Sequence, residues 1–482
     1  MITANLKPQK VFEYFEKICS VPHGSGNTKQ ISDLLAGFAR DLGLRYRQDE
    51  LNNLIVWKDA SPDKQGCAPV ILQGHMDMVC TKEAWVDKDM AKDGLDLVID
   101  GDWLRAKGTS LGGDDGIAVA IAFAILEDNS LSHPPIEVVI TVDEEVGMDG
   151  AFGIDLSDVK GRRMMNIDSE EEGVVTVSCA GGVRADSVIP AHPAQLDDGY
   201  SVFKLTIEGL LGGHSGCEID KGRGNAIKLM SRVLFGAEER FEGLRLCSIK
   251  GGRFDNVICP ECEAVVAVHA PAADDLKNYV NGFREILKNE YAAADPGVEL
   301  KIEPAEADTA YDESDSFKIA EALFMLPQGV IEMSRDFKDL PQTSLNLGVI
   351  SSDADGVHYS NSIRSSITSQ KEYVLARVRA VTETKGGTLT TRGTYPGWAY
   401  NRDSAFRATL MDVYKKQTGR EAAIAATHGG LECGLFIEKL PGLDCLSIGP
   451  DMRDIHSSAE KLNIPSVERL YDLITGFLAE LR

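Results

Sequence analysis

Residues 68–78 read Ala68-Pro-Val-Ile-Leu-Gln-Gly-His75-Met-Asp77-Met78, an apolar run that becomes polar only at its carboxyl end. A run of this kind predicts a strand that is buried on both faces of a parallel sheet. On a strand, residues two apart lie on the same face, so His75 and Asp77 are expected to point the same way. Imidazole nitrogen is a usual zinc ligand. Asp77 could accept the second N–H of the His75 ring and thereby orient it toward a metal.

Two further predicted strands end in residues that can bind metals. Residues 135–142 are followed by Asp143-Glu144-Glu145, and residues 163–167 are followed by Asp168. Open α/β sheets form their sites at the carboxyl ends of the strands. Carboxylates this concentrated would repel one another unless cations neutralised them. The three strands together therefore predict a metal site at one edge of an α/β sheet.

Two other segments complete the set of candidate ligands. Asp114 lies in Leu-Gly-Gly-Asp114-Asp115-Gly, just before an apolar helix predicted at residues 117–127, where the helix dipole favours anions. His456 lies near the far end of the chain. Two zinc ions about 3.5–4 Å apart can share a water and hold a tetrahedral intermediate, which indicates hydrolysis. The residues alone leave a second interpretation open, in which these acidic side chains are turn residues, helix caps and solvated surface.

Taken in order, the five motifs resemble those of the dizinc exopeptidases that include carboxypeptidase G and the aminoacylases. They are Gln-Gly-His75-Met-Asp77, Leu-Gly-Gly-Asp114-Asp115-Gly, Asp-Glu144-Glu145-Val-Gly, Asn-Ile-Asp168-Ser-Glu-Glu-Glu-Gly and His456-Ser. Further stretches are similar to the aminoacyl-histidine dipeptidase (cytosol non-specific dipeptidase) branch of this family. They are Leu-Gly-Gly-His214-Ser-Gly, Gly-Arg223-Gly-Asn225-Ala, Tyr395-Pro-Gly-Trp398 and His428-Gly-Gly-Leu-Glu432-Cys. The resemblance runs from about residue 8 to the C-terminus.

The resemblance implies a set of metal ligands. Asp114 would bridge two Zn²⁺ ions, for which Co²⁺ or Mn²⁺ could substitute. His75 and Asp168 would complete the ligands of one ion, and Glu145 and His456 those of the other. The expected cofactor is therefore a pair of zinc ions in each subunit.

The resemblance also implies catalytic and substrate-binding residues. Glu144 would be the general base that activates a metal-bridged water, with Asp77 supporting His75. His214 would stabilise the oxyanion from an inserted lid, acting across a dimer. Four residues would contact the substrate: Asn225, Arg364, His428 and Glu432.

The chain departs from the family pattern at two places. Asp115 stands where the family usually has Asn, which adds negative charge beside the metals. The segment from Asn256 to Cys262 also differs, and it contains a lone Cys259-Pro-Glu-Cys262. Two strand thiols explain this pair better than a structural zinc, because no second pair of cysteines is spaced to complete the site.

The pattern of predicted elements divides the chain into two domains. Residues 1–183 and 398–482 alternate strands and helices, which predicts an α/β catalytic domain with a mixed sheet between helices. Residues 184–397 predict a β-α-β-β-α-β run, and a similar order recurs after Ser314. We interpret this region as an inserted, doubled α+β domain that serves as lid and dimerisation domain.

Composition limits the classes of partner. The chain has 50 Lys and Arg against 75 Asp and Glu, a net charge of −25, which argues against binding nucleic acid or an anionic membrane. No apolar stretch reaches the roughly 18 residues of a membrane span. The N-terminus lacks a signal-peptide pattern, and ten thinly spread cysteines suit a reducing compartment. We expect a cytoplasmic homodimer that acts on small peptides.

The leading hypothesis is metal-dependent hydrolysis of unblocked dipeptides, including Xaa-His dipeptides such as carnosine. A carboxypeptidase or an N-acyl-amino-acid deacylase of the same fold would use the same metal ligands, because specificity depends on how the substrate's ends are bound. A non-catalytic metal- or peptide-binding relative is the alternative from another class. Glu144 argues against it, since a binding protein has no need of a free carboxylate beside the ligand Glu145.

Overall fold

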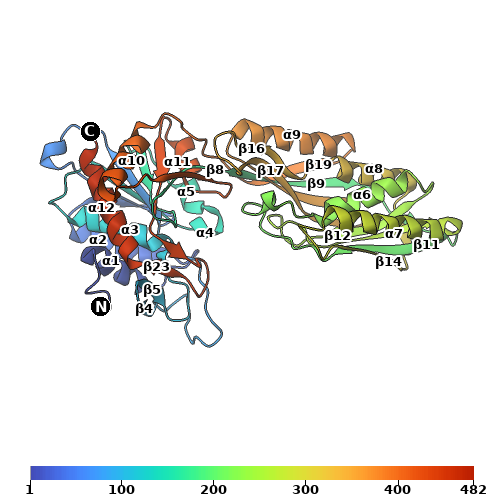
Figure 1. Cartoon of the computed structure of the whole chain (residues 1–482), viewed down its shortest axis with the longest axis horizontal. Coiled ribbons are helices and arrows are strands. Elements are labelled where there is room, and N and C mark those ends of the chain that lie inside the picture. The colour runs from blue at the N-terminus through green and yellow to red at the C-terminus, as the bar shows by residue number, and fades with distance from the viewer. Residues whose placement is uncertain (1) are drawn as a thin grey trace. The chain divides into compact units, whose positions relative to one another are not determined.

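The computed structural model describes residues 2–482, which form two compact units (Figure 1). The first unit comprises the chain up to Ser178 together with Tyr400–Ala426 and Glu432–Arg482, and the second comprises Cys179–Ala399 and Thr427–Leu431. The boundary predicted between residues 183 and 184 falls inside strand β9 (Gly181–Pro190), which pairs with strands of the second unit on both sides. Residues 427–431, predicted in the catalytic domain, belong to the second unit, where His428 Nε2 lies 2.7 Å from Ser344 Oγ.

The first unit is built on a mixed sheet. Its strands are β1 (Arg45–Gln48), β2 (Leu54–Lys58), β3 (Val70–His75), β6 (Ile136–Thr141), β7 (Arg163–Asn166), β8 (Val174–Cys179), β20 (Ala423–Thr427) and β21 (Asp444–Ser447). They lie in the order β1-β2-β6-β3-β7-β21-β8-β20, and β6, β3, β7 and β21 run parallel. Every residue of β3 and β6 is buried, as expected for strands covered on both faces. The mixed sheet predicted from the sequence is therefore present.

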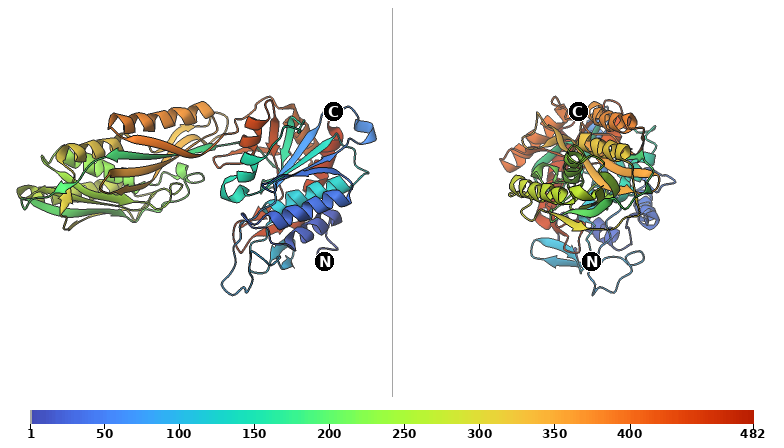
Figure 2. Two further views of the ribbon diagram at one scale, coloured as in Figure 1. Left: turned by 180° about the vertical axis from the view of Figure 1, so that it is seen from behind. Right: turned by 90° about the vertical axis from the view of Figure 1, so that its right-hand side faces the viewer.

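Helices cover both faces of this sheet (Figure 2). They are α1 (Gln9–Cys19), α2 (Lys29–Asp41), α3 (Gly113–Glu127), α4 (Glu144–Gly147), α5 (Asp149–Gly153), α10 (Ala405–Thr418), α11 (Cys433–Lys439) and α12 (Ile464–Glu480). Rings of Tyr14, Phe38 and Phe123 join α1, α2 and α3 in one layer. A small sheet adds β22 (Met452–Arg453), β23 (Lys461–Asn463), β5 (Trp103–Ala106) and β4 (Leu97–Asp100) in that order.

The second unit has one continuous antiparallel sheet. Its strands, in spatial order, are β14 (Glu299–Pro304), β11 (Tyr200–Glu208), β13 (Cys262–His269), β12 (Arg245–Gly251), β17 (Pro341–Ser352), β18 (Gly356–Ser365), β9 and β19 (Thr388–Tyr395). Strand β16 (Gly329–Met333) pairs with β17, while the short β10 (Ala194–Gln195) and β15 (Thr309–Ala310) pair with each other. The helices are α6 (Ala226–Glu238), α7 (Ala273–Glu290), α8 (Glu313–Met325) and α9 (Thr368–Thr384). They pack on one face, where alternate residues Phe203, Leu205 and Ile207 are buried (Figure 2).

This sheet contains the same arrangement twice. The first copy runs β11-α6-β12-β13-α7-β14, and the second consists of β9, α8, β17, β18, α9 and β19. In both copies the strands lie in the spatial order fourth, first, third, second, and the copies meet where β12 pairs with β17. The doubled α+β domain is thus confirmed. The sequence placed the second copy wholly after Ser314, but its first strand is β9, so the first copy is inserted within the second.

The sequence prediction did not identify two long elements, β9 and α12. Strand β9 was divided by the predicted domain boundary, and α12, which packs through Phe477 against Phe406 of α10, was not predicted. Among the residues described, no helix combines the length and the apolar character that a membrane crossing requires.

Candidate metal centre

The parallel strands bring the predicted ligands to one edge of the sheet. His75 is the last residue of β3, Asp168 follows β7 by two residues, and Glu144 and Glu145 begin α4 after β6. Because β6, β3 and β7 are parallel neighbours, their carboxyl ends meet. His456 reaches the same edge from the segment between β22 and β23.

The side chains form two groups that share Asp114. His75 Nε2 lies 3.2 Å from Asp114 Oδ1 and 3.5 Å from Asp168 Oδ1. His456 Nε2 lies 3.1 Å from Asp114 Oδ2 and 2.9 Å from Glu145 Oε2. Each group offers ligand atoms that lie within 4.8 Å of one another, a spacing suited to one ion. One oxygen of Asp114 faces each group, as a bridging carboxylate requires, and the nitrogen and oxygen donors fit zinc.

The electrostatics of the centre favour cations. Burial lowers the pKa of His75, but its hydrogen bonds to Asp114, Asp168 and Asp77 outweigh burial and hold that pKa well above the usual value. Hydrogen bonds to Asp114 and Glu145 raise the pKa of His456 to about 10. Burial raises the pKa of Asp168 to about 7. The imidazoles thus bind protons to compensate the carboxylates, a compensation that divalent ions can replace.

Glu144 and Glu145 have different surroundings although they are adjacent. Glu145 faces His456, whereas among residues 2–482 no hydrogen bond or ion pair engages the Glu144 carboxylate. Burial, followed by the nearby carboxylates of Asp168, Glu432 and Glu145, raises the pKa of Glu144 well above its usual value. A carboxylate with a raised pKa accepts a proton more readily than an ordinary one, as a general base requires.

Asp77 lies beyond the end of β3, and both its backbone carbonyl and its carboxylate face the second ring nitrogen of His75. The Nδ1 atom of His75 is 3.0 Å from the backbone carbonyl of Asp77 and 3.5 Å from its carboxylate. The carbonyl therefore takes the ring N–H, which leaves Nε2 free for a metal. The Asp77 carboxylate also accepts from the backbone N–H of Glu144 at 3.2 Å and from the Ser25 hydroxyl at 2.8 Å.

Asp115 is fully buried, and its Oδ2 accepts the backbone N–H of His75 at 3.2 Å. A Cβ added to Gly74 would meet the same oxygen at 2.4 Å, so a glycine is needed there. Burial raises the pKa of Asp115 well above its usual value. The residue that departs from the family pattern thus supports the end of β3 from the opposite face.

A layer of buried polar side chains lies beneath the ligands. Gln73 and Asn166 each precede a ligand by two residues on the same strand face, and Asn166 Nδ2 donates to Gln73 Oε1 at 2.6 Å. Glu432 Oε2 accepts from Gln73 at 2.5 Å and from the Thr141 hydroxyl at 2.6 Å. Glu432 is fully buried, and burial raises its pKa to about 8. Glu432 therefore supports the strands, and its contact with a substrate stays a prediction. Polar residues inside apolar strands were the signal that sequence analysis missed.

The second unit holds the other predicted site residues. Arg364 is 9% exposed, donates to the Tyr395 hydroxyl at 3.1 Å, and has a buried Nε without a hydrogen-bond partner in the described chain. Burial and the charge of Arg364 lower the pKa of His214, and they lower that of His428 to about 4. Both imidazoles are therefore neutral beside a permanent cation. The three side chains form a cationic cluster, which we name the arginine cluster (His214, Arg364 and His428).

Asn225 has a structural role in the second unit, and its contact with a substrate stays a prediction. Its Oδ1 accepts the backbone N–H groups of Ile227 and Lys228 and thereby caps α6, and its Nδ2 donates to the carbonyl of Leu347 at 2.8 Å. The side chain is buried, and its hydrogen-bonding groups are occupied.

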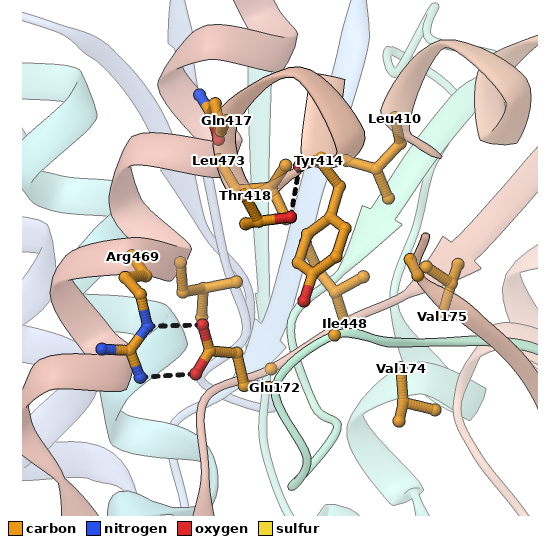
Figure 3. A pocket seen from close by; sticks show the side chains of 14 residues that line it. Glu172, Val174, Val175, Leu410, Tyr414, Gln417, Thr418, Ile448, Arg469 and Leu473 are labelled. Carbon is orange, nitrogen blue, oxygen red and sulfur yellow. Dashed lines mark hydrogen bonds and ion pairs between the residues drawn. The ribbon is translucent and has the colours of Figure 1, made fainter. Parts of the chain in front are cut away.

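Two other features lie apart from the metal ligands. Cys259 and Cys262 are buried, with Cys259 Sγ 3.0 Å from the carbonyl of Glu261, and neither belongs to a metal-binding group in the described chain. A crevice between α10, α12 and β8 is lined mainly by apolar side chains such as Leu410 and Tyr414 (Figure 3). The ion pair of Glu172 with Arg469 lies at its rim, and no candidate site residue lines it.

The chain is similar to known peptidases along its whole length. The M20 peptidase dimerisation domain model matches residues 205–295. The cytosol non-specific dipeptidase of Escherichia coli (strain K12) is 38% identical over 481 residues, which is 99% of each chain. The chain belongs to the M20 metallopeptidase family. It is therefore a metal-dependent peptide hydrolase, and the two ligand groups that share Asp114 fit the dinuclear centre of such an enzyme.

Solved structures agree with this assignment. The aminoacylhistidine dipeptidase of Vibrio alginolyticus has a TM-score of 0.93 and 36% identity, covering 100% of this chain and 98% of that one. An aminopeptidase, PepT, from Bacillus cereus has a TM-score of 0.58 with 15% identity, covering 98% and 99% of the two chains, and shows the fold alone. The predicted family and zinc-exopeptidase-like fold are confirmed.

Proposed function

We propose that the M20 peptidase described here is a dizinc dipeptidase that hydrolyses unblocked dipeptides, including Xaa-His dipeptides such as carnosine. The observation that carries the proposal is the sharing of Asp114 by two ligand groups, with Glu144 unengaged beside them. The Escherichia coli relative is named a non-specific dipeptidase and the Vibrio alginolyticus one an aminoacylhistidine dipeptidase. Both names are consistent with this reaction.

The ligands divide between two ions. His75 and Asp168 would hold one, Glu145 and His456 would hold the other, and both groups would share Asp114. When bound, the ions polarise the scissile carbonyl and lower the pKa of the attacking water. Zinc is the proposed metal, and Co²⁺ or Mn²⁺ can replace it because sites of mixed nitrogen and oxygen donors accept several divalent ions.

Glu144 moves the proton. It takes a proton from the attacking water as the new C–O bond forms, and it gives that proton to the leaving amine as the peptide C–N bond breaks. The raised pKa of Glu144 suits both halves of this transfer, since it makes the carboxylate a stronger base than an ordinary glutamate.

His214 donates a hydrogen bond to the oxyanion. Its Nδ1 accepts backbone N–H groups from Gly216 at 3.3 Å and Cys217 at 3.4 Å, so in the neutral ring Nε2 carries the proton. The lowered pKa of His214 keeps the ring neutral near pH 7. A neutral donor with a fixed tautomer is suited to an oxygen that gains negative charge.

The arginine cluster binds the free carboxylate of the dipeptide. The unpartnered Nε of Arg364 can donate to a carboxylate oxygen, and guanidinium groups match carboxylates geometrically. Recognition of this end would explain a preference for unblocked substrates.

The experiment that tests this function compares three substrates. The zinc-loaded protein is incubated with carnosine, an N-acetyl amino acid and a tripeptide, and the released amino acids are measured. We expect hydrolysis of carnosine to be fastest. Faster release from the N-acetyl amino acid would favour the deacylase alternative, faster release from the tripeptide would favour another exopeptidase, and no release from any would favour the non-catalytic relative.

We further propose a cytoplasmic homodimer that associates through the second unit. The matched dimerisation-domain model and the printed name of the cytosolic relative support this proposal. Light scattering during size-exclusion chromatography would give the mass of the assembly, and a single-chain mass would contradict it.

A further inference from the structure

Glu460 is a buried carboxylate that the proposed reaction does not use. It is 3% exposed and lies four residues after His456. Its Oε2 accepts the backbone N–H groups of Leu111 at 2.8 Å and Gly112 at 3.2 Å, and its Oε1 accepts that of Gly113 at 2.8 Å. These consecutive amides lead directly into Asp114.

The backbone before Asp114 is shaped to receive this carboxylate. Gly112 has a φ of 66°, in the left-handed region, which lets successive N–H groups converge on one anion. A Cβ on Gly112 would lie 2.8 Å from Met78 Sδ, and one on Gly113 would lie 3.3 Å from Glu460 Oε1. The two glycines therefore leave room for the close approach of Glu460 and Met78. Hydrogen bonds from amides to a carboxylate are charge-assisted and stronger than neutral ones.

These hydrogen bonds connect the backbone before Asp114 to the segment that carries His456. The His456 side chain is 45% exposed, whereas that of His75 is 1% exposed. His456 itself has a φ of 59° in a short loop, so neither regular structure nor burial fixes its ring. The loop is held internally by the bond from Glu460 N–H to the carbonyl of Ser457 at 3.2 Å. A tie at Glu460 therefore fixes the loop relative to Asp114.

We propose that Glu460 is a positioning residue that sets the distance between His456 and Asp114 and thereby completes the ion site of Asp114, Glu145 and His456. The inference rests on the proposed dimetal centre. The ion site of His75, Asp114 and Asp168 depends less on this tie, because it shares only Asp114 with the tie and its other two ligands follow β3 and β7 of the central sheet. Loss of the tie therefore weakens one ion site much more than the other.

Glu460→Gln tests the proposal with almost no change in volume. The amide group would replace one carboxylate oxygen by NH₂, which cannot accept a backbone N–H. The metal-free protein is titrated with Zn²⁺ in competition with a chromophoric chelator. We expect the more weakly bound ion to lose a further 10–100-fold or so in affinity, the usual effect of losing a group that supports a ligand. The tighter ion should change less than about threefold on the same scale.

Glu83→Gln is the matched control. The Glu83 carboxylate accepts the hydroxyl of Ser458 in the same loop, but it does not contact the amides of residues 111–113. This variant removes the same charge near the same loop, and both of its zinc affinities should match those of the wild type. Unchanged affinities in Glu460→Gln, or equal weakening of both ions, would overturn the proposal.

A second variant covers the case in which Glu460→Gln does not fold. Glu460→Asp keeps the charge and shortens the side chain by one methylene group. It should show a smaller loss at the same ion, and wild-type affinity at both ions would contradict a positioning role. At saturating zinc, kcat of either variant should recover most of the wild-type value. A wild type that binds two zinc ions but cleaves no dipeptide would refute the proposed function alone, because the titration uses no peptide.

Discussion

Two histidines of the first unit, His75 and His456, lie among carboxylates, whereas His214 and His428 of the second unit lie beside Arg364. The pKa of His456 is raised to about 10 by hydrogen bonds to Asp114 and Glu145, while that of His428 is lowered to about 4 by burial and Arg364. The same side chain is thus prepared to exchange a proton for a metal in one unit and to stay neutral in the other. Under the proposed function, the first unit would hold cations and the second would receive the carboxylate of the substrate.

The largest effect should come from removing the metals of the first unit. Chelation should reduce dipeptide hydrolysis to background, and Zn²⁺, Co²⁺ or Mn²⁺ should restore it, because the carboxylates need divalent cations. Turnover is measured beside elemental analysis of the same sample. Undiminished turnover in protein shown to be free of metal would refute the dizinc centre.

Glu144→Gln should reduce kcat by roughly 10²–10⁴-fold, the usual contribution of a general base, while both ions stay bound. Elemental analysis and steady-state kinetics measure the two quantities. Glu145→Gln is the matched control and should lose metal, because Glu145 faces His456. If metal content instead falls with activity in Glu144→Gln, the roles of the two glutamates are reversed.

His214→Ala in the second unit should lower kcat by roughly 10²–10³-fold, as expected for the loss of one oxyanion donor, with metal content unchanged. This variant also tests whether the donor acts across a dimer. Mixing it with Glu144→Gln should then restore about a quarter of wild-type activity, given random exchange and one intact site in each mixed dimer. If activity does not recover although subunit exchange is demonstrated, His214 acts within its own chain or not at all.

The smallest effect should come from Arg364→Met, which removes the cation of the second unit. We expect KM for a dipeptide to rise about 10–100-fold, because a hydrogen bond to a charged group contributes roughly 1.5–3 kcal/mol. KM for the same dipeptide with a C-terminal amide should change little. The control is Arg392→Met, an exposed arginine that pairs with Asp186 and Asp255. An equal loss with the amide substrate would show that Arg364 does not bind the carboxylate.

Sequence reasoning found the features that follow from local pattern. Apolar strands that end in His75, Glu144 and Asp168 predicted a site at one sheet edge, and the structure places those strands side by side. The contact of Asp114 with both groups was implied by the family resemblance, because no local pattern joins residues so far apart. Substrate contact by Asn225 and Glu432 was inferred from motif position, and burial with a full set of hydrogen-bond partners gives Asn225 another role.

The features that sequence reasoning missed depend on long-range contacts. The amides that bind Glu460 lie some 350 residues away along the chain, and a buried carboxylate is indistinguishable from a surface one in sequence. Strand β9 was divided because the boundary was predicted between residues 183 and 184, whereas the chain enters the second unit at Cys179, before the strand begins. Gln73 and Asn166 were overlooked because single polar residues in apolar strands do not disturb the strand prediction.

The nested order of the chain has a consequence during synthesis. The inner copy of the second unit, β11 to β14, leaves the ribosome before α8 to β19 can join β9, and β21 can pair with β7 only after the whole second unit has been made. Domains generally fold as they emerge, from the N-terminus onward. His456 is thus among the last site residues to be translated. A nascent chain that does not yet include His456 lacks one proposed ligand of one ion. Peptide hydrolysis can therefore begin only when synthesis of the chain is nearly complete.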